Sequence, residues 1–309
     1  MKNLGYLGPS GTFTEMAANE FLKEIKEPHV EKISYPDISE LIQAVAEGEI
    51  YQAVVPIENS LEGSVNITLD YLAHKVSLKI GLEIVLPINQ QLMTATGVDI
   101  NDIKEIYSHP QALAQCREFL NSFNSGCQIK KVSSTAEAAQ LINSNNGSPD
   151  ITKAAIGSRL AAKLNELTII EENIQDNDSN WTRFVLLVRE KNYHTARDKP
   201  YFWPQKDFKT SIICSPIKNR PGILHEILAE FATRNINLTR IESRPTKKML
   251  GDYLFFIDFA GQVGSKESQN VITNLKEKTS HLKILGSYQT LTCQQEKIAP
   301  GEVDDHEIK

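Results

Sequence analysis

The sequence predicts an α/β protein made of two lobes and a smaller third domain. Its 309 residues exceed what one small domain needs. Apolar runs of strand length alternate with helical patterns through residues 1–190, and a similar alternation resumes at residue 208. Residues 191–207 are polar and contain two prolines, so they are predicted to be a linker between these regions.

The first lobe shows a β-α-β-α-β order. Asp37 and Glu40 form a capping box before its second helix, and Gly48 lies just beyond the end of that helix. Alternation of this kind requires right-handed crossovers and predicts a mostly parallel sheet. The strands are expected at 3–7, 33–35 and 53–57, and the helices at 13–23 and 38–47.

The second lobe is expected at about 79–165. Pro110 suits the first position of a helix because the missing N–H has no partner there, and Ser134 with Glu137 forms another capping box. The strands are expected at 80–87, 88–95, 103–107, 129–132 and 154–158, and the helices at 110–121, 135–143 and 159–164.

An apolar, β-branched run then predicts a buried parallel strand at 182–189. If this strand belongs to the first lobe, the chain crosses twice between the lobes. A ligand cleft is then expected between them, because open α/β sheets bind ligands at the ends of their strands.

The third domain, residues 208–290, shows a β-α-β-β-α-β order, which predicts a ferredoxin-like fold. Residues 291–309 lose periodicity and become polar and acidic, so a disordered tail is predicted there. The strands are expected at 210–214, 238–243, 253–260 and 281–288, and the helices at 223–234 and 266–278.

Composition and motif spacing argue against several functional classes. A net charge of −6 without a basic stripe argues against nucleic-acid binding. No apolar run is long enough to span a membrane, and the N-terminus lacks a signal-peptide pattern. The four cysteines are scattered without metal or redox spacing. We therefore expect a cytoplasmic protein that binds neither a metal nor a cofactor.

Polar side chains gather where predicted strands end and helices begin. Hydroxyls, amides and helix N-termini at such junctions suit a small, oxygen-rich anion. The candidates are Ser10, Thr12 and Thr14 in the first junction, Asn59 and Ser60 in the second, Ser108, His109, Gln111 and Gln115 in the third, and Thr182 and Arg183 at the entrance of the strand near residue 182.

Each junction also has an ordinary structural explanation. The first two could be capped turns, His109 could be a structural residue at a helix start, and Phe184 could pack in the core. Phosphate-loop and dinucleotide motifs are absent. A Ser-His-Asp acyl transferase remains an alternative, although the Gly-x-Ser-x-Gly elbow is absent too.

Five segments in order resemble the prephenate dehydratase family, in its single-function form with a C-terminal ACT domain. The resemblance covers residues 4–288. No chorismate mutase helices precede residue 4, so the fused form is not expected. The segments are Gly-Pro-Ser-Gly-Thr-Phe-Thr-Glu at 8–15, Pro-Ile-Glu-Asn-Ser at 56–60, Ser-His-Pro-Gln at 108–111, Asn-x-Thr-Arg-Phe at 180–184 and Glu-Ser-Arg-Pro at 242–245.

The resemblance implies decarboxylative dehydration of prephenate to phenylpyruvate in phenylalanine biosynthesis, without a cofactor. It also implies two lobes like those of type II periplasmic binding proteins. A homodimer or homotetramer with paired ACT domains, inhibited by L-phenylalanine, is the implied regulatory form. The implied inhibitor site comprises Pro221, Gly222, Ile223, Leu224, Asn237, Glu242, Ser243, Arg244 and Pro245, with Ile223 where the family has alanine.

Within the site, the resemblance implies an essential hydroxyl at Thr182, together with Asn59 and Ser60. Because hydroxide leaves poorly, a donor to the departing oxygen typically contributes about 10²–10⁴-fold. Arg183 and helix N-termini are expected to hold the carboxylates of the dianion, and His109 or a relayed water to supply the proton. Phe184 is expected either to line the site or to pack in the core.

Two alternatives stay open. Arogenate dehydratase acts on the amino analogue of prephenate and is the alternative within the enzyme class. A catalytically inactive amino-acid sensor is the alternative outside it. The sensor would need a secretion signal for transport or a DNA-binding helix pair for transcription, and the sequence shows neither.

Overall fold

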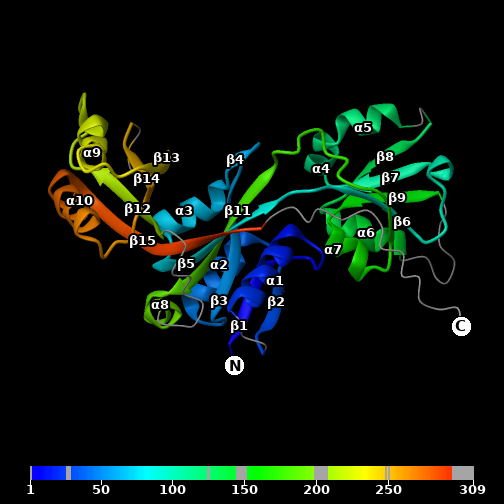
Figure 1. Ribbon diagram of the computed structural model, residues 1–309, viewed down its shortest axis with the longest axis horizontal. Coiled ribbons are helices and arrows are strands. Elements are labelled where there is room, and N and C mark those ends of the chain that lie inside the picture. Colours follow the sequence, from blue (N-terminus) through cyan, green and yellow to red (C-terminus); the bar gives the residue numbers. More distant parts are fainter. Residues whose placement is uncertain are drawn as a thin grey trace, which may run out of the picture.

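The computed structural model describes residues 2–25, 29–123, 126–143, 152–197, 208–247, 249 and 251–293. Figure 1 shows three parts in a row, with the first lobe in the middle, the second lobe on one side and the third domain on the other. Within the described ranges, no helix is long and apolar enough to cross a membrane.

The first lobe is formed by two stretches of the chain. Between them, the chain leaves for the second lobe and comes back. The elements of the first lobe are β1 (Asn3–Leu7), α1 (Phe13–Ile25), β2 (Glu31–Tyr35), α2 (Ile38–Glu47), β3 (Gln52–Asn59), β4 (Gly63–Ser64), α3 (Asn66–His74), β5 (Leu78–Pro87), β11 (Trp181–Arg189) and α8 (Glu190–Arg197).

The predicted return strand is β11, but its predicted parallel orientation is wrong. β11 lies between β5 and β3 and runs antiparallel to both. The chain leaves the first lobe along β5 and returns along β11, so the two strands run in opposite directions. The caps of α2 were predicted correctly: Asp37 Oδ1 accepts the Glu40 N–H at 2.9 Å, and Gly48 ends the helix with φ of 89°.

Two helices of the first lobe were not predicted. α3 follows the polar turn after β3. α8 occupies residues 190–197, of which 191–197 were assigned to a linker, and packs against β5 and β11. Tyr193 Oη on α8 donates to Ser287 O at 2.9 Å and so ties the helix to the third domain. The predicted linker is therefore partly ordered. Its remaining residues, 198–207, lie outside the described ranges.

The second lobe is a separate five-stranded sheet in the order β10-β6-β9-β7-β8. The predicted single helix at 110–121 is divided at Cys116, because Asp176 accepts the N–H groups of Arg117 and Glu118 and caps a second helix. The elements are β6 (Gln91–Thr94), a 3₁₀ turn (Ile100–Asp102), β7 (Glu105–Ser108), α4 (Pro110–Gln115), α5 (Arg117–Ser122), β8 (Gln128–Lys131), α6 (Thr135–Asn143), β9 (Lys153–Gly157), α7 (Arg159–Leu164) and β10 (Thr168–Glu171).

The third domain has the predicted ferredoxin-like order, with antiparallel neighbours arranged β13-β14-β12-β15. Its elements are β12 (Phe208–Pro216), α9 (Ile223–Ala232), β13 (Leu238–Pro245), β14 (Tyr253–Ala260), α10 (Lys266–Lys278) and β15 (Thr279–Thr292).

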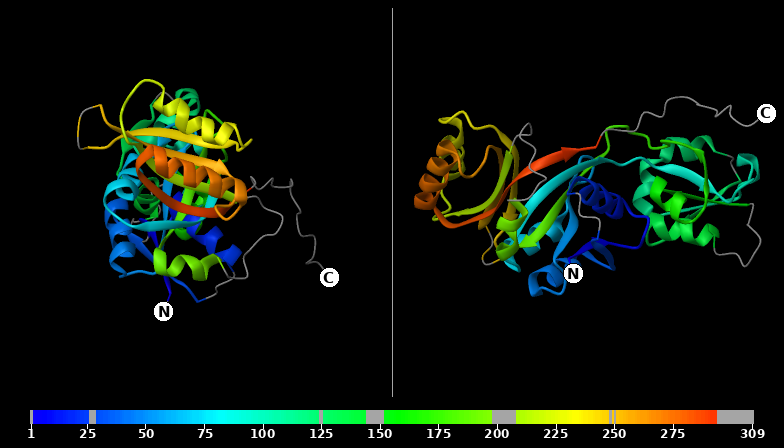
Figure 2. Two further views of the ribbon diagram at one scale, coloured as in Figure 1. Left: turned by 90° about the vertical axis from the view of Figure 1, so that its left-hand side faces the viewer. Right: turned by 60° about the horizontal axis from the view of Figure 1, so that its bottom comes forward.

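β15 joins the third domain to the first lobe. Figure 2 shows this long strand running from one to the other, and its end at Thr290–Thr292 pairs with β5 in parallel. Residues 291 and 292 therefore belong to a strand, although they were predicted to begin a disordered tail. The rest of that predicted tail, from residue 294, lies outside the described ranges.

The sheet of the first lobe is covered on both faces. One face packs against α1, where Phe21 contacts the cluster that contains Phe184. The other face packs against α2, α3 and the third domain, where Val185 shares a cluster with Tyr288. Burial on both faces explains why β11 is almost continuously apolar. Because side chains alternate along a strand, successive residues of β11 contact the elements on opposite faces of the sheet.

Candidate active site

The entrance of β11 brings Thr182 opposite Asn59 on β3. Asn59 Nδ2 donates to Thr182 Oγ1 at 2.9 Å and to Asn180 Oδ1 at 2.8 Å. Thr182 is only 8% exposed. Because the amide nitrogen can only donate, it occupies a lone pair of the Thr182 oxygen and leaves the hydroxyl hydrogen for another acceptor.

The orientation of the Asn59 amide is fixed by the turn that follows β3. Its Oδ1 accepts the N–H groups of Leu61 at 2.9 Å and Glu62 at 3.0 Å, as in an Asx turn. The oxygen is committed to the turn, so the nitrogen faces Thr182.

Ser60 holds the same two segments together. Its Oγ donates to Ser179 O at 2.8 Å and accepts the Trp181 N–H at 2.9 Å, and its own N–H donates to Trp181 O at 2.8 Å. The structure thus brings Thr182, Asn59 and Ser60 together. The Ser60 hydroxyl hydrogen is already used in the bond to Ser179 O.

Asn180 completes this polar cluster, although it was not among the predicted site residues. It is 1% exposed, and its Nδ2 has no partner among the described residues. A buried donor without a partner is costly, so such groups commonly meet a ligand or water. The signal in the sequence was its place as the first residue of the Asn-x-Thr-Arg-Phe segment.

Arg183 lies on the opposite face of β11 from Thr182, because successive residues of a strand alternate. Its guanidinium contacts Glu58 Oε2 at 2.5 Å, Glu83 Oε2 at 2.5 Å and Asp258 Oδ2 at 2.8 Å. Burial opposes its charge, but Glu83 and Asp258 outweigh burial and hold the pKa of Arg183 well above its usual value. Its predicted role in holding a substrate carboxylate is therefore not supported by the structure.

The first junction is a capped helix start. Thr12 Oγ1 donates to Leu7 O at 2.8 Å and accepts the Glu15 N–H at 3.3 Å, and Glu15 Oε2 accepts the Gly11 N–H at 2.7 Å. This arrangement resembles a capping box, with the carboxylate bonded to the residue before the cap. A carboxylate already occupies the helix N-terminus that was expected to bind an anion.

The same loop docks against the second lobe. Gly11 has φ of +96°, and a Cβ there would lie 3.0 Å from the Cα of Ala161. Ser158 Oγ donates to Gly11 O at 2.5 Å across the lobe boundary. Of the other predicted residues in this loop, Ser10 bonds the Tyr6 hydroxyl at 2.9 Å, and Thr14 is buried.

The third junction is used mainly for local structure. Ser108 is fully buried and donates to Ile156 O at 2.7 Å, so its predicted substrate contact is not supported. His109 caps α4, with Nδ1 accepting the Gln111 N–H at 3.2 Å. The neutral ring therefore carries its hydrogen on Nε2 and presents that nitrogen as a donor.

Gln115 contacts Gln90, one of two glutamines that lie where the chain crosses between the lobes. Its Oε1 accepts Gln90 Nε2 at 3.3 Å, and Gln175 Oε1 accepts the Gln90 N–H at 2.9 Å. Gln90 is 2% exposed, and its Oε1 has no partner among the described residues. Sequence reasoning missed Gln90 and Gln175 because neither lies in a recognisable motif.

Phe184 packs in the core against α1 and is 2% exposed. The prediction that it lines the site is therefore not supported, whereas its alternative role in the core is confirmed.

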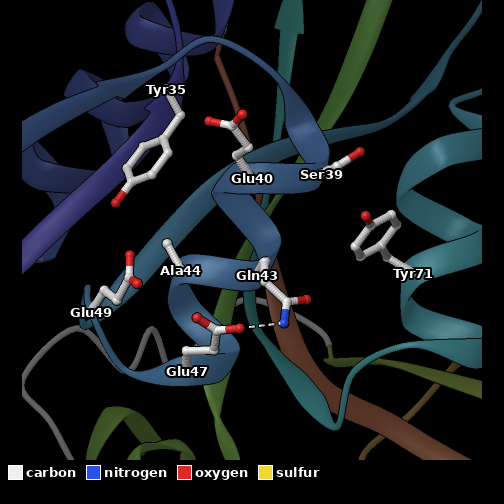
Figure 3. A pocket seen from close by; sticks show the side chains of 8 residues that line it. All are labelled: Tyr35, Ser39, Glu40, Gln43, Ala44, Glu47, Glu49 and Tyr71. Carbon is white, nitrogen blue, oxygen red and sulfur yellow. Dashed lines mark hydrogen bonds between the residues drawn. The ribbon is translucent and has the colours of Figure 1, made fainter.

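A depression of about 360 Å³ lies elsewhere on the first lobe, around α2. Figure 3 shows Glu40, Glu47 and Glu49 among its lining side chains, with Tyr35 and Tyr71 on either side of the helix. The depression shares no residue with the polar cluster at Thr182, and its acidic lining does not suit an anionic substrate. In the described part of the chain, no group of three or more His, Cys, Asp or Glu side chains could hold a metal.

Comparison with known proteins matches residues 4–192 to the prephenate dehydratase family and residues 217–276 to the ACT domain. The chain belongs to the prephenate dehydratase family. The predicted family and enzyme class, a hydro-lyase, are confirmed, as are the fold class and the C-terminal ACT domain.

Relatives of this prephenate dehydratase support the assignment over most of its length. The prephenate dehydratase of Methanocaldococcus jannaschii is 40% identical over 284 residues, which is 92% of this chain and 96% of that protein. The crystal structure of a prephenate dehydratase from Arthrobacter aurescens in complex with L-Phe is 34% identical, has a TM-score of 0.76, and matches 93% of this chain and 90% of its own. The Arabidopsis thaliana protein named arogenate dehydratase/prephenate dehydratase 2 is 36% identical over 294 residues, covering 92% of this chain and 72% of that protein.

The ACT domain carries the predicted inhibitor residues on two segments, 221–224 and 242–245, and at Asn237 between them. Gly222 is the N-cap of α9, with φ of +84°, next to exposed Pro221, buried Ile223 and half-buried Leu224. Asn237 accepts the Ala260 N–H through its carbonyl at 2.9 Å.

The second segment is the end of β13, where Glu242 is half-buried while Ser243 and Pro245 are exposed. Arg244 contacts Asp70 Oδ1 at 2.9 Å and Asn66 Oδ1 at 2.6 Å, both on α3 of the first lobe. The predicted regulatory strand is thus attached directly to the catalytic region.

Proposed function

We propose that this prephenate dehydratase converts prephenate to phenylpyruvate with Thr182 as the hydrogen-bond donor to the departing hydroxyl. The observation that supports this role is the 2.9 Å bond from Asn59 Nδ2 to Thr182 Oγ1. In the reaction, the bond between the ring and its carboxylate breaks and CO2 leaves. The released electron pair completes the aromatic ring and expels the hydroxyl, which takes up a proton and leaves as water.

Thr182 stabilises the oxygen on which negative charge develops. A preorganised donor in a buried site is worth far more than the same donor in water. Because the hydroxyl of threonine is not an acid near neutral pH, its contribution is a directed hydrogen bond, and the proton itself comes from another group or from water. Asn59 fixes the direction of that bond.

The ion pairs of Arg183 fit this chemistry better than a substrate contact would. A guanidinium against the departing carboxylate would stabilise the substrate more than the transition state, in which that charge is being lost. Neutral donors orient such a group at a smaller cost, and the buried Nδ2 of Asn180 is available for this purpose, since the Oδ1 of the same amide and Thr182 Oγ1 both accept from Asn59 Nδ2.

We assign the other end of the substrate to the second lobe. Gln115 on α4 bonds Gln90 where the chain crosses between lobes, so α4 lies near the lobe boundary. His109 and Gln111 stand at the start of this helix, with Gln111 exposed. Because Nδ1 of His109 accepts the Gln111 N–H, we assign its Nε2 as the ring nitrogen that hydrogen-bonds the substrate.

The experiment is an assay of the purified protein on two substrates. We expect prephenate to give phenylpyruvate, followed by its ultraviolet absorbance. Arogenate is tested in parallel, with phenylalanine as the measured product. Turnover of arogenate alone would establish the alternative activity, and turnover of neither substrate would contradict the assignment.

L-Phenylalanine is proposed as an inhibitor that binds the ACT domain through 221–224, Asn237 and 242–245. The ACT match and the relative crystallised with L-Phe support this. Calorimetry on the full chain, together with initial rates, tests it, and absence of binding would contradict it.

A homodimer or homotetramer paired through ACT domains stays a prediction. It is supported by the exposed Ile241 on β13, an edge strand of the sheet. Light scattering would measure the oligomeric state. A cytoplasmic location also stays a prediction.

A further inference from the structure

A largely buried ion cluster lies behind Thr182, on the other face of the sheet. We define it as Glu58, Glu83, Arg183, Lys209 and Asp258. Arg183 contacts all three carboxylates, and Lys209 Nζ contacts Glu83 Oε1 at 2.5 Å. Glu58, Glu83 and Arg183 come from the first lobe, whereas Lys209 and Asp258 come from the ACT domain. The cluster therefore joins the two parts of the protein through charge.

The cluster shares its strands with the catalytic pair. Arg183 follows Thr182 on β11, and Glu58 precedes Asn59 on β3. Across the two strands, Thr182 lies opposite Asn59 and Arg183 lies opposite Glu58. The ladder is irregular immediately after Arg183, where the register shifts. Because a bulge weakens the regular backbone pairing, side-chain contacts must do more to fix the strands at this point.

Asp258 is the member that the ACT domain holds most firmly. It is 3% exposed, and Ser211 Oγ donates to its Oδ1 at 2.5 Å. Its other oxygen, Oδ2, accepts Arg183 Nη2 at 2.8 Å. Ser211 also bonds the hydroxyl of Tyr288, at 2.6 Å. Asp258 thus links the ACT sheet to Arg183, the residue next to Thr182.

We propose that Asp258 of the ACT domain is a positioning residue for the Thr182–Asn59 pair and acts through Arg183. The proposal rests on the proposed role of Thr182. It makes the ACT domain part of the support of the active site, in addition to any regulatory role.

The test compares two variants that each weaken one contact between the domains. Asp258→Asn keeps the size of the side chain and one acceptor oxygen but removes its charge. Lys247→Met is the matched control, because Lys247 Nζ pairs with Asp70 Oδ2 at 2.6 Å across the same boundary, away from β11. For both variants, kcat and KM for prephenate are measured, along with hydrogen exchange of peptides spanning 57–64 and 176–184.

We expect Asp258→Asn to lower kcat about tenfold with KM within about twofold, because small displacements of catalytic groups are costly. Exchange in both peptides should become faster. Lys247→Met should match the wild type in both measurements. Unchanged exchange and kcat in Asp258→Asn would overturn the proposal, and so would equal losses in the two variants. If Asp258→Asn does not fold, Ser211→Ala gives the milder test. We expect it to lower kcat by less than Asp258→Asn would, and an unchanged kcat would contradict the proposal.

Dependence on Arg183 is tested in a double variant. Because Asp258 acts through Arg183, Asp258→Asn should not lower kcat further in an Arg183→Met background. Losses that multiply would overturn the proposed route. A wild-type protein that does not turn over prephenate would contradict the proposed function alone, because the exchange measurement still decides the role of Asp258.

Discussion

The two faces of β11 differ in charge, in partners and in what they do. Thr182 faces a neutral group of amides and hydroxyls, while Arg183, the next residue, faces three carboxylates and the ACT domain. The Thr-Arg-Phe segment resembles a single catalytic unit in the sequence. In the fold, it is divided by strand alternation into a chemical residue, an ion-pairing residue and a core residue.

The energetics of the two faces should differ as well. Removal of a donor from a preorganised site raises the free energy of the transition state and leaves most of the folded structure intact. Removal of one partner from a buried ion cluster leaves uncompensated charge and affects the fold. Variants on the neutral face should therefore affect activity with little change in stability, whereas variants on the charged face should affect stability as well as activity.

Among variants that leave Thr182 itself unchanged, the largest effect is expected on the neutral face, for Asn59→Asp. This change keeps the oxygen that holds the turn after β3 but removes the donor to Thr182. We expect kcat/KM for prephenate to fall about 100-fold, by analogy with the loss of one preorganised donor. Steady-state kinetics measures this effect.

The control for the new charge is Asn177→Asp. Asn177 lies in the turn just before β11, is exposed, and uses its oxygen to accept the Ser179 N–H at 2.8 Å. This variant adds the same charge near the site without affecting Thr182. A similar loss in the two variants would show that charge, rather than the lost donor, causes the effect.

On the charged face, Arg183→Met should lower the free energy of unfolding by about 3–5 kcal/mol, as for other broken buried ion pairs. Urea denaturation measures it. Arg159→Met is the comparison, because Arg159 pairs with Glu172 at 2.9 Å with both side chains more than 40% exposed. Exposed pairs are worth about 0–1 kcal/mol, so equal effects of the two changes would contradict the role of the cluster.

A smaller effect is expected where the ACT domain attaches to α3. Burial raises the pKa of Asp70, but Lys247 and Arg244 outweigh burial and lower it below its usual value, so the contact is charged at neutral pH. Asp70→Asn should weaken inhibition by L-phenylalanine about fivefold, the low end of typical coupling between sites. Rates measured without the inhibitor should stay within about twofold of the wild type. Unaltered inhibition would exclude this contact from the coupling.

Local signals allowed much of the fold to be predicted from the sequence. The cap at Asp37 and the β-α-β-β-α-β order depend on residues close in the chain, and both are present. The orientation of β11 was not predictable in this way, because it depends on how the chain returns from the second lobe. The division of Thr182 from Arg183 could have been anticipated, since alternation along a strand is a local rule.

The site was harder to predict than the fold. Hydroxyls that bind a ligand and hydroxyls that stabilise the fold have the same sequence pattern: Thr12 caps a helix, and Ser108 bonds a carbonyl of the neighbouring strand β9. The bond between Asn59 and Thr182 joins residues 123 positions apart, so only the strand register reveals it.

The most direct test of the donor role of Thr182 compares Thr182→Val with Thr182→Ser. Valine keeps the branched shape and removes the hydroxyl, whereas serine keeps the hydroxyl. We predict that Thr182→Val lowers kcat for phenylpyruvate formation about 10²–10⁴-fold. Its KM and free energy of unfolding should stay close to the wild type, and Thr182→Ser should retain clearly more activity. Turnover by Thr182→Val close to that of the wild type would contradict the role of this hydroxyl.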